Sequence, residues 1–414
     1  MTIKNSSPLC YKKGKLHFDN IPLASIAQRV KTPFYLYSEK TLLANYQLFL
    51  DSALKAKIED PLICFALKAN PNLKLLKSLA RAGAGADIVS QGELKRALDA
   101  GIKASKIVFS GVGKTGEEIK KGLKAGIYSF NVESIEELEL INSEAKKLKK
   151  KARVAFRLNP KVHAKTHKHI STGFKTHKFG LLKEDILKAL KKKGLWTHTD
   201  LVGLSMHIGS QLTCLKATKK AIKELGTLAL EVNRPLEFLD VGGGLGVDYG
   251  PEEEKRFSTP KQYMEIISNE LKNSFYKKNT FDQRPRIVFE PGRVIAARAG
   301  AFITSVVRTK KSEDCHFAIV DGGMNDFVRA SLYGAYHDIL TEKKAGKKTI
   351  KTDIVGPICE TADCFGTARS LPSLKAGDLI SVADVGAYGF SMASHYNMRS
   401  LPKEVVVSLK GKLS

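Results

Sequence analysis

Hydrophobic and polar positions follow two alternating patterns along the central part of the chain. From about residue 60, short β-rich apolar runs are followed by longer segments of helical period, without a low-complexity linker. The predicted strands are Leu62–Leu67, Ala86–Ser90, Ile107–Ser110, Ser129–Val132, Arg153–Leu158, Leu201–Ile208, Leu236–Val241 and Arg286–Phe289. The predicted helices are Leu73–Ala82, Gly92–Ala100, Thr115–Lys124, Ser134–Lys149, Lys183–Lys192, Ala217–Val232 and Pro260–Ser274. Several of these helices open on Ser, Thr or Pro, which favour helix starts.

Eight such strand–helix units fit a (β/α)₈ barrel of the TIM type, with a doubly wound sheet as the alternative. After Pro291 the pattern changes to β-rich runs at Val294–Val307, His316–Val320, Ile350–Val355, Leu379–Val385 and Glu404–Leu409. The first 35 residues contain strand-like pieces at Tyr11–Phe18 and Pro33–Tyr37, which we expect to pair with that later sheet. The sequence therefore predicts an α/β barrel over residues 36–290. A mainly antiparallel, β-sandwich-like domain is predicted over residues 1–35 and 291–414.

Composition excludes several classes of protein. With 414 residues, 43% of them hydrophobic, the chain is too large for a lone binding module and too apolar for wholesale disorder. A net charge of +26 is compatible with a partner such as nucleic acid or an anionic surface. However, the densest lysine runs lie in or just after helical patterns, which is typical of solvated helix faces. We therefore expect neither a nucleic-acid nor a membrane partner.

The chain carries no sign of export or cross-linking. No stretch approaches the ~18 apolar residues of a membrane span, and the first residues lack the apolar core of a secretion signal, so we expect a cytoplasmic protein. The six cysteines form no Cys-x-x-Cys pair, which favours reduced thiols over disulfides or structural zinc.

Polar residues with distinct chemistry follow four of the predicted strands. In a parallel barrel the active site is built at the carboxyl ends of the strands, so these residues are the natural candidates. Lys68 follows the first strand, His207 lies at the sixth, Gly242–Gly246 follow the seventh, and Glu290 and Arg293 follow the last. A lysine at the end of a buried strand suits a covalent bond to an aldehyde cofactor. A glycine loop after the seventh strand is typical of phosphate sites, and a carboxylate at the barrel mouth can keep a pyridine nitrogen protonated.

Each of these features has a plainer interpretation when taken alone. Lys68 could extend to the rim of the barrel, the glycine run could be a tight turn, and His207 could be a hydrogen-bonded core histidine. Their occurrence together, at four strand ends of one predicted barrel, favours the functional interpretation.

Two other patterns suggest chemistry that we do not expect. Gly111–Thr115 resembles a nucleotide phosphate loop, but the glycine that this loop requires is replaced by Val108. Four histidines lie close together without the spacing of a known metal motif, so no metal is predicted. These histidines are His163, His167, His169 and His177.

Seven motifs together resemble the diaminopimelate decarboxylases, within the fold-type III pyridoxal-phosphate decarboxylases that also include ornithine and arginine decarboxylases. The resemblance spans nearly the whole chain. The motifs are Phe65–Asn70, Phe109–Lys114, Ser171–Gly173, Lys178–Gly180, His207–Gln211, Glu290–Arg293 and Gly356–Glu360.

The resemblance implies a role for each matching residue. Lys68 would bind the cofactor aldehyde, His207 would stack on its ring, and Glu290 would pair with the ring nitrogen. The residues expected to contact pyridoxal 5′-phosphate are Lys68, Asp87, His207, Ser210, Gly242, Gly243, Gly244, Glu290, Gly292, Arg293 and Tyr388. Those expected to contact the substrate are Arg293, Arg329, Tyr333, Glu360 and Tyr388. Cys359 would return a proton, and Cys359 and Glu360 would reach the active site of a partner subunit, which implies a homodimer.

The reaction implied by the resemblance is decarboxylation of meso-2,6-diaminopimelate to L-lysine, the last step of lysine synthesis. The alternative on the same scaffold is decarboxylation of ornithine, arginine or a carboxylated polyamine. Arg329 and Tyr333 argue against it, because a distal amine has no use for an arginine. An alanine racemase is disfavoured by Glu290, since that family places an arginine at the ring nitrogen. A non-catalytic, cofactor-carrying regulator is disfavoured because Lys68 and Cys359 are retained. A basic nucleic-acid binder drawn by the charge of +26 is the other non-catalytic alternative, and its affinity would fall steeply with added salt and show no base preference.

Overall fold

The computed structural model describes residues 7–162, 178–250, 257–282, 284–313 and 315–414. The chain divides into two compact units, each built from separate stretches of sequence. One unit, called here the barrel unit, consists of Tyr46–Val247 and Lys255–Gly292. The other, called the β unit, consists of Met1–Asn45, Asp248–Glu254 and Arg293–Ser414.

The barrel unit contains a closed barrel of parallel strands in the order in which they occur along the chain, so the predicted barrel is confirmed and the doubly wound sheet is wrong. Its strands are β5 (Leu62–Ala66), β6 (Gly85–Ile88), β7 (Ile107–Phe109), β8 (Ser129–Val132), β9 (Ala152–Leu158), β10 (Thr199–Met206), β11 (Phe238–Asp240) and β12 (Arg286–Phe289). β12 pairs with β5 to close the ring. Cys64, Val108, Phe238 and other apolar side chains from strands around the barrel pack into one cluster.

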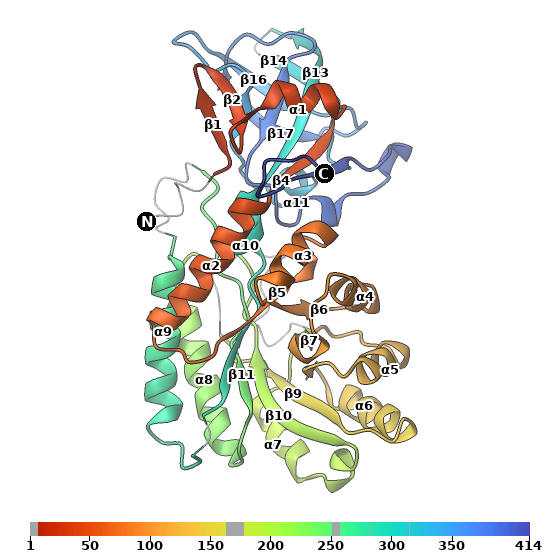
Figure 1. Cartoon of the computed structure of the whole chain (residues 1–414), viewed down its shortest axis with the longest axis vertical. Coiled ribbons are helices and arrows are strands. Elements are labelled where there is room, and N and C mark those ends of the chain that lie inside the picture. Colours follow the sequence, from red (N-terminus) through yellow and green to blue (C-terminus); the bar gives the residue numbers. More distant parts are fainter. Residues whose placement is uncertain (1–6, 163–177, 251–256, 283, 314) are drawn as a thin grey trace. The chain divides into compact units, whose positions relative to one another are not determined.

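Helices surround these strands, with α4, α5 and α6 following one another past β6 to β9 in Figure 1. They are α2 (Glu39–Lys55), α3 (Leu73–Arg81), α4 (Gln91–Asp99), α5 (Gly116–Ala125), α6 (Ile135–Lys147), α7 (Lys183–Lys191), α8 (Lys216–Val232) and α9 (Pro260–Leu271). The residues at the N-termini explain where two of these helices begin. Thr115 and Glu118 form a capping box at the start of α5, and Ser134 caps the start of α6. None of the helices within the described ranges is long and apolar enough to cross a lipid bilayer.

The β unit is built mainly on antiparallel strands, as predicted. Its central strand is β13 (Gly300–Lys311), which pairs antiparallel with β4 (Phe34–Ser38), β14 (His316–Val320) and β18 (Leu379–Val382). The other strands are β1 (Leu9–Lys12), β2 (Lys15–Phe18), β3 (Ile21–Pro22), β15 (Ile339–Thr341), β16 (Ile350–Val355), β17 (Cys364–Leu371) and β19 (Lys403–Val407). The pairing of β4 with β13 confirms that the segment around Pro33–Tyr37 joins the later sheet.

Three details of the β unit differ from the prediction. Tyr11–Phe18 is not one strand but parts of β1 and β2, separated by a turn in which Lys13 and Gly14 have positive φ. These strands form a separate small sheet with β3. Val294–Val307 begins as helix α10 (Arg293–Ala296) and enters β13 only at Gly300. Every residue from 291 to 300 is buried, Arg293 and Arg298 included, so burial in this run has no period from which helix could be told from strand.

Candidate active site

Lys68 lies where the chain leaves β5, in a single helical turn at Leu67–Ala69. Its Nζ forms a hydrogen-bonded ion pair with Oδ2 of Asp87, which β6 holds beside the end of β5. Asp87 is fully buried, whereas 39% of the Lys68 side chain is exposed. Within the described part of the chain, Oδ1 of Asp87 has no hydrogen-bond partner. The strand end therefore holds an accessible amine next to a buried carboxylate with unused acceptor capacity.

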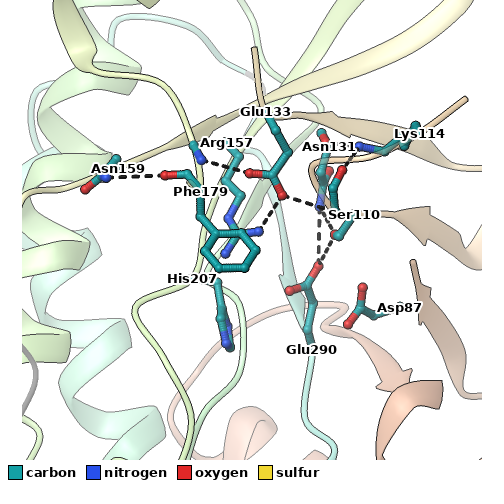
Figure 2. A network of polar contacts seen from close by, with 12 residues as sticks. Asp87, Ser110, Lys114, Asn131, Glu133, Arg157, Asn159, Phe179, His207 and Glu290 are labelled. Carbon is teal, nitrogen blue, oxygen red and sulfur yellow. Dashed lines mark hydrogen bonds and ion pairs between the residues drawn. The ribbon is translucent and has the colours of Figure 1, made fainter. Parts of the chain in front are cut away.

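Glu290 follows β12 and points into a buried polar network (Figure 2). Its Oε1 accepts hydrogen bonds from Ser110 Oγ at 3.1 Å and from Asn131 Nδ2 at 3.3 Å. Burial raises the pKa of Glu290 well above its ordinary value, and the neighbouring carboxylates of Asp240 and Asp87 raise it further. The burial and the neighbouring carboxylates therefore favour the protonated form of Glu290.

His207 follows β10 and is held as a neutral ring. The backbone amide of Gly243 donates to its Nδ1 at 3.2 Å, so the ring proton lies on Nε2. Desolvation lowers the pKa of His207 well below its usual value, and the charges of Arg157 and Lys68 lower it further. A flat, uncharged imidazole is suited to stacking on an aromatic ligand.

The glycine loop after β11 packs so closely on its neighbours that side chains are excluded. A Cβ atom on Gly243 would lie 2.1 Å from the carbonyl oxygen of Glu290, and one on Gly244 would lie 2.1 Å from that of Gly209. Gly242 and Gly244 also have positive φ, which glycine adopts at little cost. Bare backbone is thereby placed beside the segment that carries His207 and the half-buried Ser210, an arrangement typical of phosphate sites.

A second layer of charged contacts fixes the loops behind these residues. Glu133 accepts hydrogen bonds from Arg157 Nη1 at 2.5 Å and from the amides of Gly111 and Gly180 at 3.1 and 2.8 Å. Arg157 also stacks on Phe179, as Figure 2 shows. Since Glu133 and Arg157 are both buried, these contacts hold the loop after β7 and the segment before α7 as rigid supports.

The pattern at Gly111–Thr115 is explained by this support layer. Lys114 is buried and its Nζ donates to Glu137 at 2.7 Å and to the carbonyl oxygens of Gly111 and Asn131. Its amine is fully used within the protein. These contacts of Lys114 therefore order the loop after β7, in agreement with the expectation that this motif is not a nucleotide site.

Arginines and aromatic rings form a second cluster, which lies in the β unit. Arg293, at the start of α10, donates to the hydroxyl of Tyr249 at 3.0 Å and lies 4.8 Å from the ring centre of Tyr388. Arg329, at the start of α11 (Arg329–Tyr333), stacks over Tyr249 at 4.9 Å and contacts Nε2 of His337 at 2.9 Å. Burial raises the pKa of Tyr249, but the charges of Arg293 and Arg329 outweigh this effect and lower it below its usual value. A buried pair of guanidinium groups of this kind is suited to binding an anion.

The remaining predicted residues of the β unit lie nearer its surface. Tyr333 is half-buried at the end of α11, while Cys359 and Glu360 are exposed in the segment after β16. Within the described part of the chain, Glu360 accepts a hydrogen bond from the hydroxyl of Tyr396, and the amide of Cys359 donates to Asn397. The structure thus places Lys68, Asp87, His207, Ser210, Gly242–Gly244, Glu290 and Gly292 in the barrel unit, and Arg293, Arg329, Tyr333, Cys359, Glu360 and Tyr388 in the β unit.

Sequence reasoning did not assign roles to Ser110, Asn131, Asp240, Tyr249 and His337. Asn131 and Asp240 carry a signal that could have been used, because each is a polar residue inside a short apolar strand of a predicted barrel. Tyr249 and His337 carry no comparable signal. They meet only because the short segment Asp248–Glu254 belongs to the β unit.

Two predicted features lie outside the described residues: the motif Ser171–Gly173 and the cluster of His163, His167, His169 and His177. Among the residues that are described, no group of three or more His, Cys, Asp or Glu side chains is placed to hold a metal ion.

The barrel residues suit pyridoxal phosphate. The ligand carries an aldehyde, a basic ring nitrogen and a phosphate, and the barrel offers an amine, a buried carboxyl group with a raised pKa and a glycine loop for these three groups. The unused Oδ1 of Asp87 and the close-packed glycines are further features that an apolar core would not contain.

Comparison with known proteins agrees with this arrangement. Residues 50–297 match the family described as "Pyridoxal-dependent decarboxylase, pyridoxal binding domain". The chain is 43% identical over 407 residues to a diaminopimelate decarboxylase of Zymomonas mobilis, an alignment that covers 97% of this chain and 93% of the relative. It also resembles crystal structures of diaminopimelate decarboxylase complexed with L-lysine. For the Helicobacter pylori protein the identity is 41%, the TM-score 0.86 and the coverage 95% of both chains. For the Methanocaldococcus jannaschii protein, "m. jannaschii" in its description, the identity is 37%, the TM-score 0.90 and the coverage 97% and 93%.

Proposed function

The chain belongs to the diaminopimelate decarboxylase family of pyridoxal-dependent decarboxylases, and from this premise we propose how its residues carry out the reaction. The protein converts meso-2,6-diaminopimelate to L-lysine and carbon dioxide, the last step of lysine synthesis, with pyridoxal phosphate as cofactor. The observation that supports the assignment of residues best is the placement of Lys68, His207, the glycine loop and Glu290 at one end of the barrel strands.

When bound, pyridoxal phosphate supplies an aldehyde that captures an amino group and a ring that withdraws electrons from it. Lys68 is the residue that holds the cofactor, because its amine is accessible at the strand end. Nucleophilic attack requires the neutral amine, and Asp87 Oδ2 is placed to accept the proton that the ammonium group of Lys68 gives up. His207 stacks on the ring, and its neutral state avoids placing a positive charge against a ring that must accept electrons.

Ser210 and Gly242–Gly244 would bind the phosphate, and Glu290 would bind the ring nitrogen. The buried environment of Glu290 favours its protonated form, so Glu290 would give a proton to a basic nitrogen and remain as the compensating anion. Gly292, Arg293 and Tyr388 are assigned to the cofactor from the family resemblance.

The β unit supplies the groups that recognise the substrate. Diaminopimelate differs from ornithine and arginine in carrying a second carboxylate, and Arg293 and Arg329 are two buried cations with which it can pair. We assign Tyr333 and Tyr388 to the same carboxylate and Glu360 to the distal ammonium group. Cys359 returns a proton after the loss of carbon dioxide.

We propose that a second copy of the chain covers the surface around Cys359. Met398 is 97% exposed in this region, and Tyr396 and Leu401 are also exposed. Exposed apolar side chains of this size are typical of a subunit interface. A homodimer would bury them and would place Cys359 and Glu360 at the active site of the partner subunit. The cytoplasmic location and the absence of nucleic-acid and membrane partners stay predictions.

The test is to incubate the purified protein with meso-diaminopimelate and, separately, with ornithine, arginine and lysine, and to measure the amines and carbon dioxide formed. We expect lysine and carbon dioxide in equal amounts from diaminopimelate alone. Lys68→Ala removes the attacking amine and should abolish turnover, whereas Lys95→Ala alters an exposed ion pair on α4 and should not. Release of amine from ornithine or arginine at a comparable rate would contradict the assigned specificity.

Covalent attachment gives a second readout that does not depend on turnover. Borohydride reduction of the cofactor-loaded protein should fix one label, and mass spectrometry should find it on residue 68. Label at another lysine would refute the role of Lys68 even if the protein decarboxylates diaminopimelate.

A further inference from the structure

Two buried carboxyl groups in the barrel unit share one hydrogen-bond donor. Asp240 is the last residue of β11, and Glu290 follows the neighbouring strand β12. Nδ2 of Asn131 lies 3.1 Å from Asp240 Oδ2 and 3.3 Å from Glu290 Oε1. The exposed fractions are 0% for Asp240 and 8% for Glu290, so both groups are largely removed from solvent.

Two carboxyl groups that lie together in a buried site favour a proton on one of them, because two adjacent negative charges are costly there. Asp240 uses both oxygens as acceptors, Oδ1 from the amide of Gly242 at 2.9 Å and Oδ2 from Asn131. We therefore take Asp240 as the ionised member. Oε1 of Glu290 accepts from Ser110 and Asn131, which leaves Oε2 to carry the proton. Burial raises the pKa of both groups, to about 6 for Asp240 and well above the ordinary value for Glu290, in agreement with a proton on Glu290.

The groups that surround this pair favour retention of the proton. Asp87 on β6 adds a negative charge, and the ammonium group of Lys68, which opposes it, is already paired with Asp87. Two neutral groups complete the surroundings, Cys64 on β5 and Tyr263 on α9. Burial raises the pKa of each, and the negative charge of Asp240 raises it further. Full ionisation of the pair would place two adjacent negative charges in a site with little solvent.

We propose that Asp240 is a positioning residue. Its negative charge keeps one proton on Glu290, where that proton is available to the cofactor ring nitrogen. The identity of that ring rests on the proposed function. When the nitrogen approaches, the O–H bond of Glu290 breaks and an N–H bond forms with the nitrogen lone pair. Glu290 becomes a carboxylate, the total charge is unchanged and no co-reactant is needed. Asp240 then provides a second negative charge that stabilises the protonated nitrogen.

The first experiment measures this proton without cofactor. Infrared spectroscopy detects the carbonyl stretch of a protonated carboxyl group above the amide bands, and this band is followed against pH in protein stripped of cofactor. We expect a band at neutral pH in the native protein and its loss in Glu290→Gln. Asp240→Asn removes the neighbouring charge and should move the midpoint of the band to lower pH. Asn131→Ala removes a donor that stabilises the ionised forms and should move it to higher pH.

Opposite shifts distinguish this role from a structural one, because both substitutions remove a hydrogen bond from the same network. Glu270→Gln serves as the matched control, since Glu270 is a nearly buried carboxylate on α9 with no part in the network, and it should leave the midpoint unchanged. A native spectrum identical to that of Glu290→Gln, or shifts in the same direction for Asp240→Asn and Asn131→Ala, would overturn the proposal. If Asp240→Asn does not fold, Asp240→Ser, which also removes the charge, takes its place, and a midpoint that does not move to lower pH would overturn the proposal.

The second experiment tests the transfer to the ring. The protein is loaded with pyridoxal phosphate labelled with ¹⁵N in the ring, and the ¹⁵N chemical shift is followed against pH. We expect a protonated nitrogen in the native protein and a proton affinity at least about tenfold lower in Asp240→Asn. Equal affinities in the two proteins would refute the role of Asp240 and leave the proposed function intact. Failure to bind the cofactor at all would refute the proposed function, while the infrared result on the carboxyl pair would still stand.

Discussion

The two units of the molecule collect opposite charges in their buried polar clusters. In the barrel unit, Asp87 pairs with the amine of Lys68, and the carboxylates of Asp240 and Asp87 help to raise the pKa of the buried Glu290, so the cluster is acidic and favours retention of a proton. In the β unit, Arg293 and Arg329 share the ring of Tyr249, so the cluster is basic and lowers the pKa of that tyrosine. The acidic cluster is suited to a basic ring nitrogen and the basic cluster to a substrate carboxylate. The comparison therefore predicts that changes in the barrel unit affect the chemical step, whereas changes in the β unit affect substrate binding.

Each cluster also contains a neutral histidine, and the two histidines carry their proton on different nitrogens. Gly243 donates to Nδ1 of His207, which leaves the proton on Nε2. Arg329 donates to Nε2 of His337, and Nδ1 then donates to the carbonyl oxygen of Ala383 at 2.8 Å. Desolvation lowers the pKa of both rings well below the usual value. Each unit thus fixes the tautomer of its histidine through the partner that the fold provides.

Among substitutions that leave Lys68 in place, the largest effect should come from Glu290→Gln in the barrel unit. An amide cannot give a proton to the ring nitrogen, so the electron-withdrawing power of the cofactor should fall. We expect kcat to fall by about 10³-fold while KM changes by less than about threefold. Steady-state kinetics on diaminopimelate check this, with Glu270→Gln as the control. A rise in KM at unchanged kcat would contradict the division of roles between the two units.

The next largest effect should come from Arg329→Met in the β unit. Methionine keeps much of the apolar packing and removes the charge that we assign to the distal carboxylate. We expect KM to rise by about 10²-fold, with the affinity for pyridoxal phosphate unchanged. Arg298→Met is the matched control, because Arg298 is a buried arginine that donates to the carbonyl oxygen of Asp248 and has no assigned role in binding. An equal rise in KM in both variants would show that the loss is structural.

The sequence predicts the parts of both units that depend on local pattern. The barrel strands alternate with capped helices, and the residues directly after apolar runs, such as Lys68 and Glu290, fall at the strand ends by geometry. Asp240 and Asn131 were missed because their direction depends on how the strands twist around the closed barrel. Val294–Val307 was assigned wrongly because its first part is buried throughout and shows no period. The cluster around Tyr249 depends on contacts between residues far apart in the chain, which no local pattern contains.

A stability measurement on Asp384 sharpens the comparison, because this carboxylate lies near the basic cluster. Burial raises the pKa of Asp384 to about 6, against an ordinary value of 3.8. The folded protein therefore holds this proton more tightly than the unfolded chain, so stability falls as the pH rises from about 4 to about 6 and stays lower above that range. Asp384→Asn removes this cost and suits the positive φ of 58°.

The free energy of unfolding of Asp384→Asn should exceed that of the native protein by at most about 3 kcal/mol at pH 7.5, and the difference should vanish near pH 4. Denaturant unfolding at the two pH values measures this. Asp99→Asn changes an exposed carboxylate on α4 and should shift the free energy by less than about 1 kcal/mol at either pH. A loss of stability in Asp384→Asn at pH 7.5 would mean that attraction to Arg298 outweighs the cost of burial.

The smallest effect should come from His337→Phe, which tests how the basic cluster is oriented. His337 packs against Tyr249 and Phe327, and a phenyl ring can keep these contacts while Arg329 loses its acceptor at 2.9 Å. We expect KM to rise by about tenfold without a change in cofactor affinity. The same replacement in the barrel unit, His207→Phe, should instead weaken cofactor binding and lower kcat. Burial lowers the pKa of His337 in the folded protein, so the folded state loses stability relative to the unfolded chain as the pH falls below about 6.5. The part of this loss that comes from His337 should disappear in His337→Phe. If both phenylalanine variants changed the same kinetic constant, the two histidines would not serve different halves of the reaction.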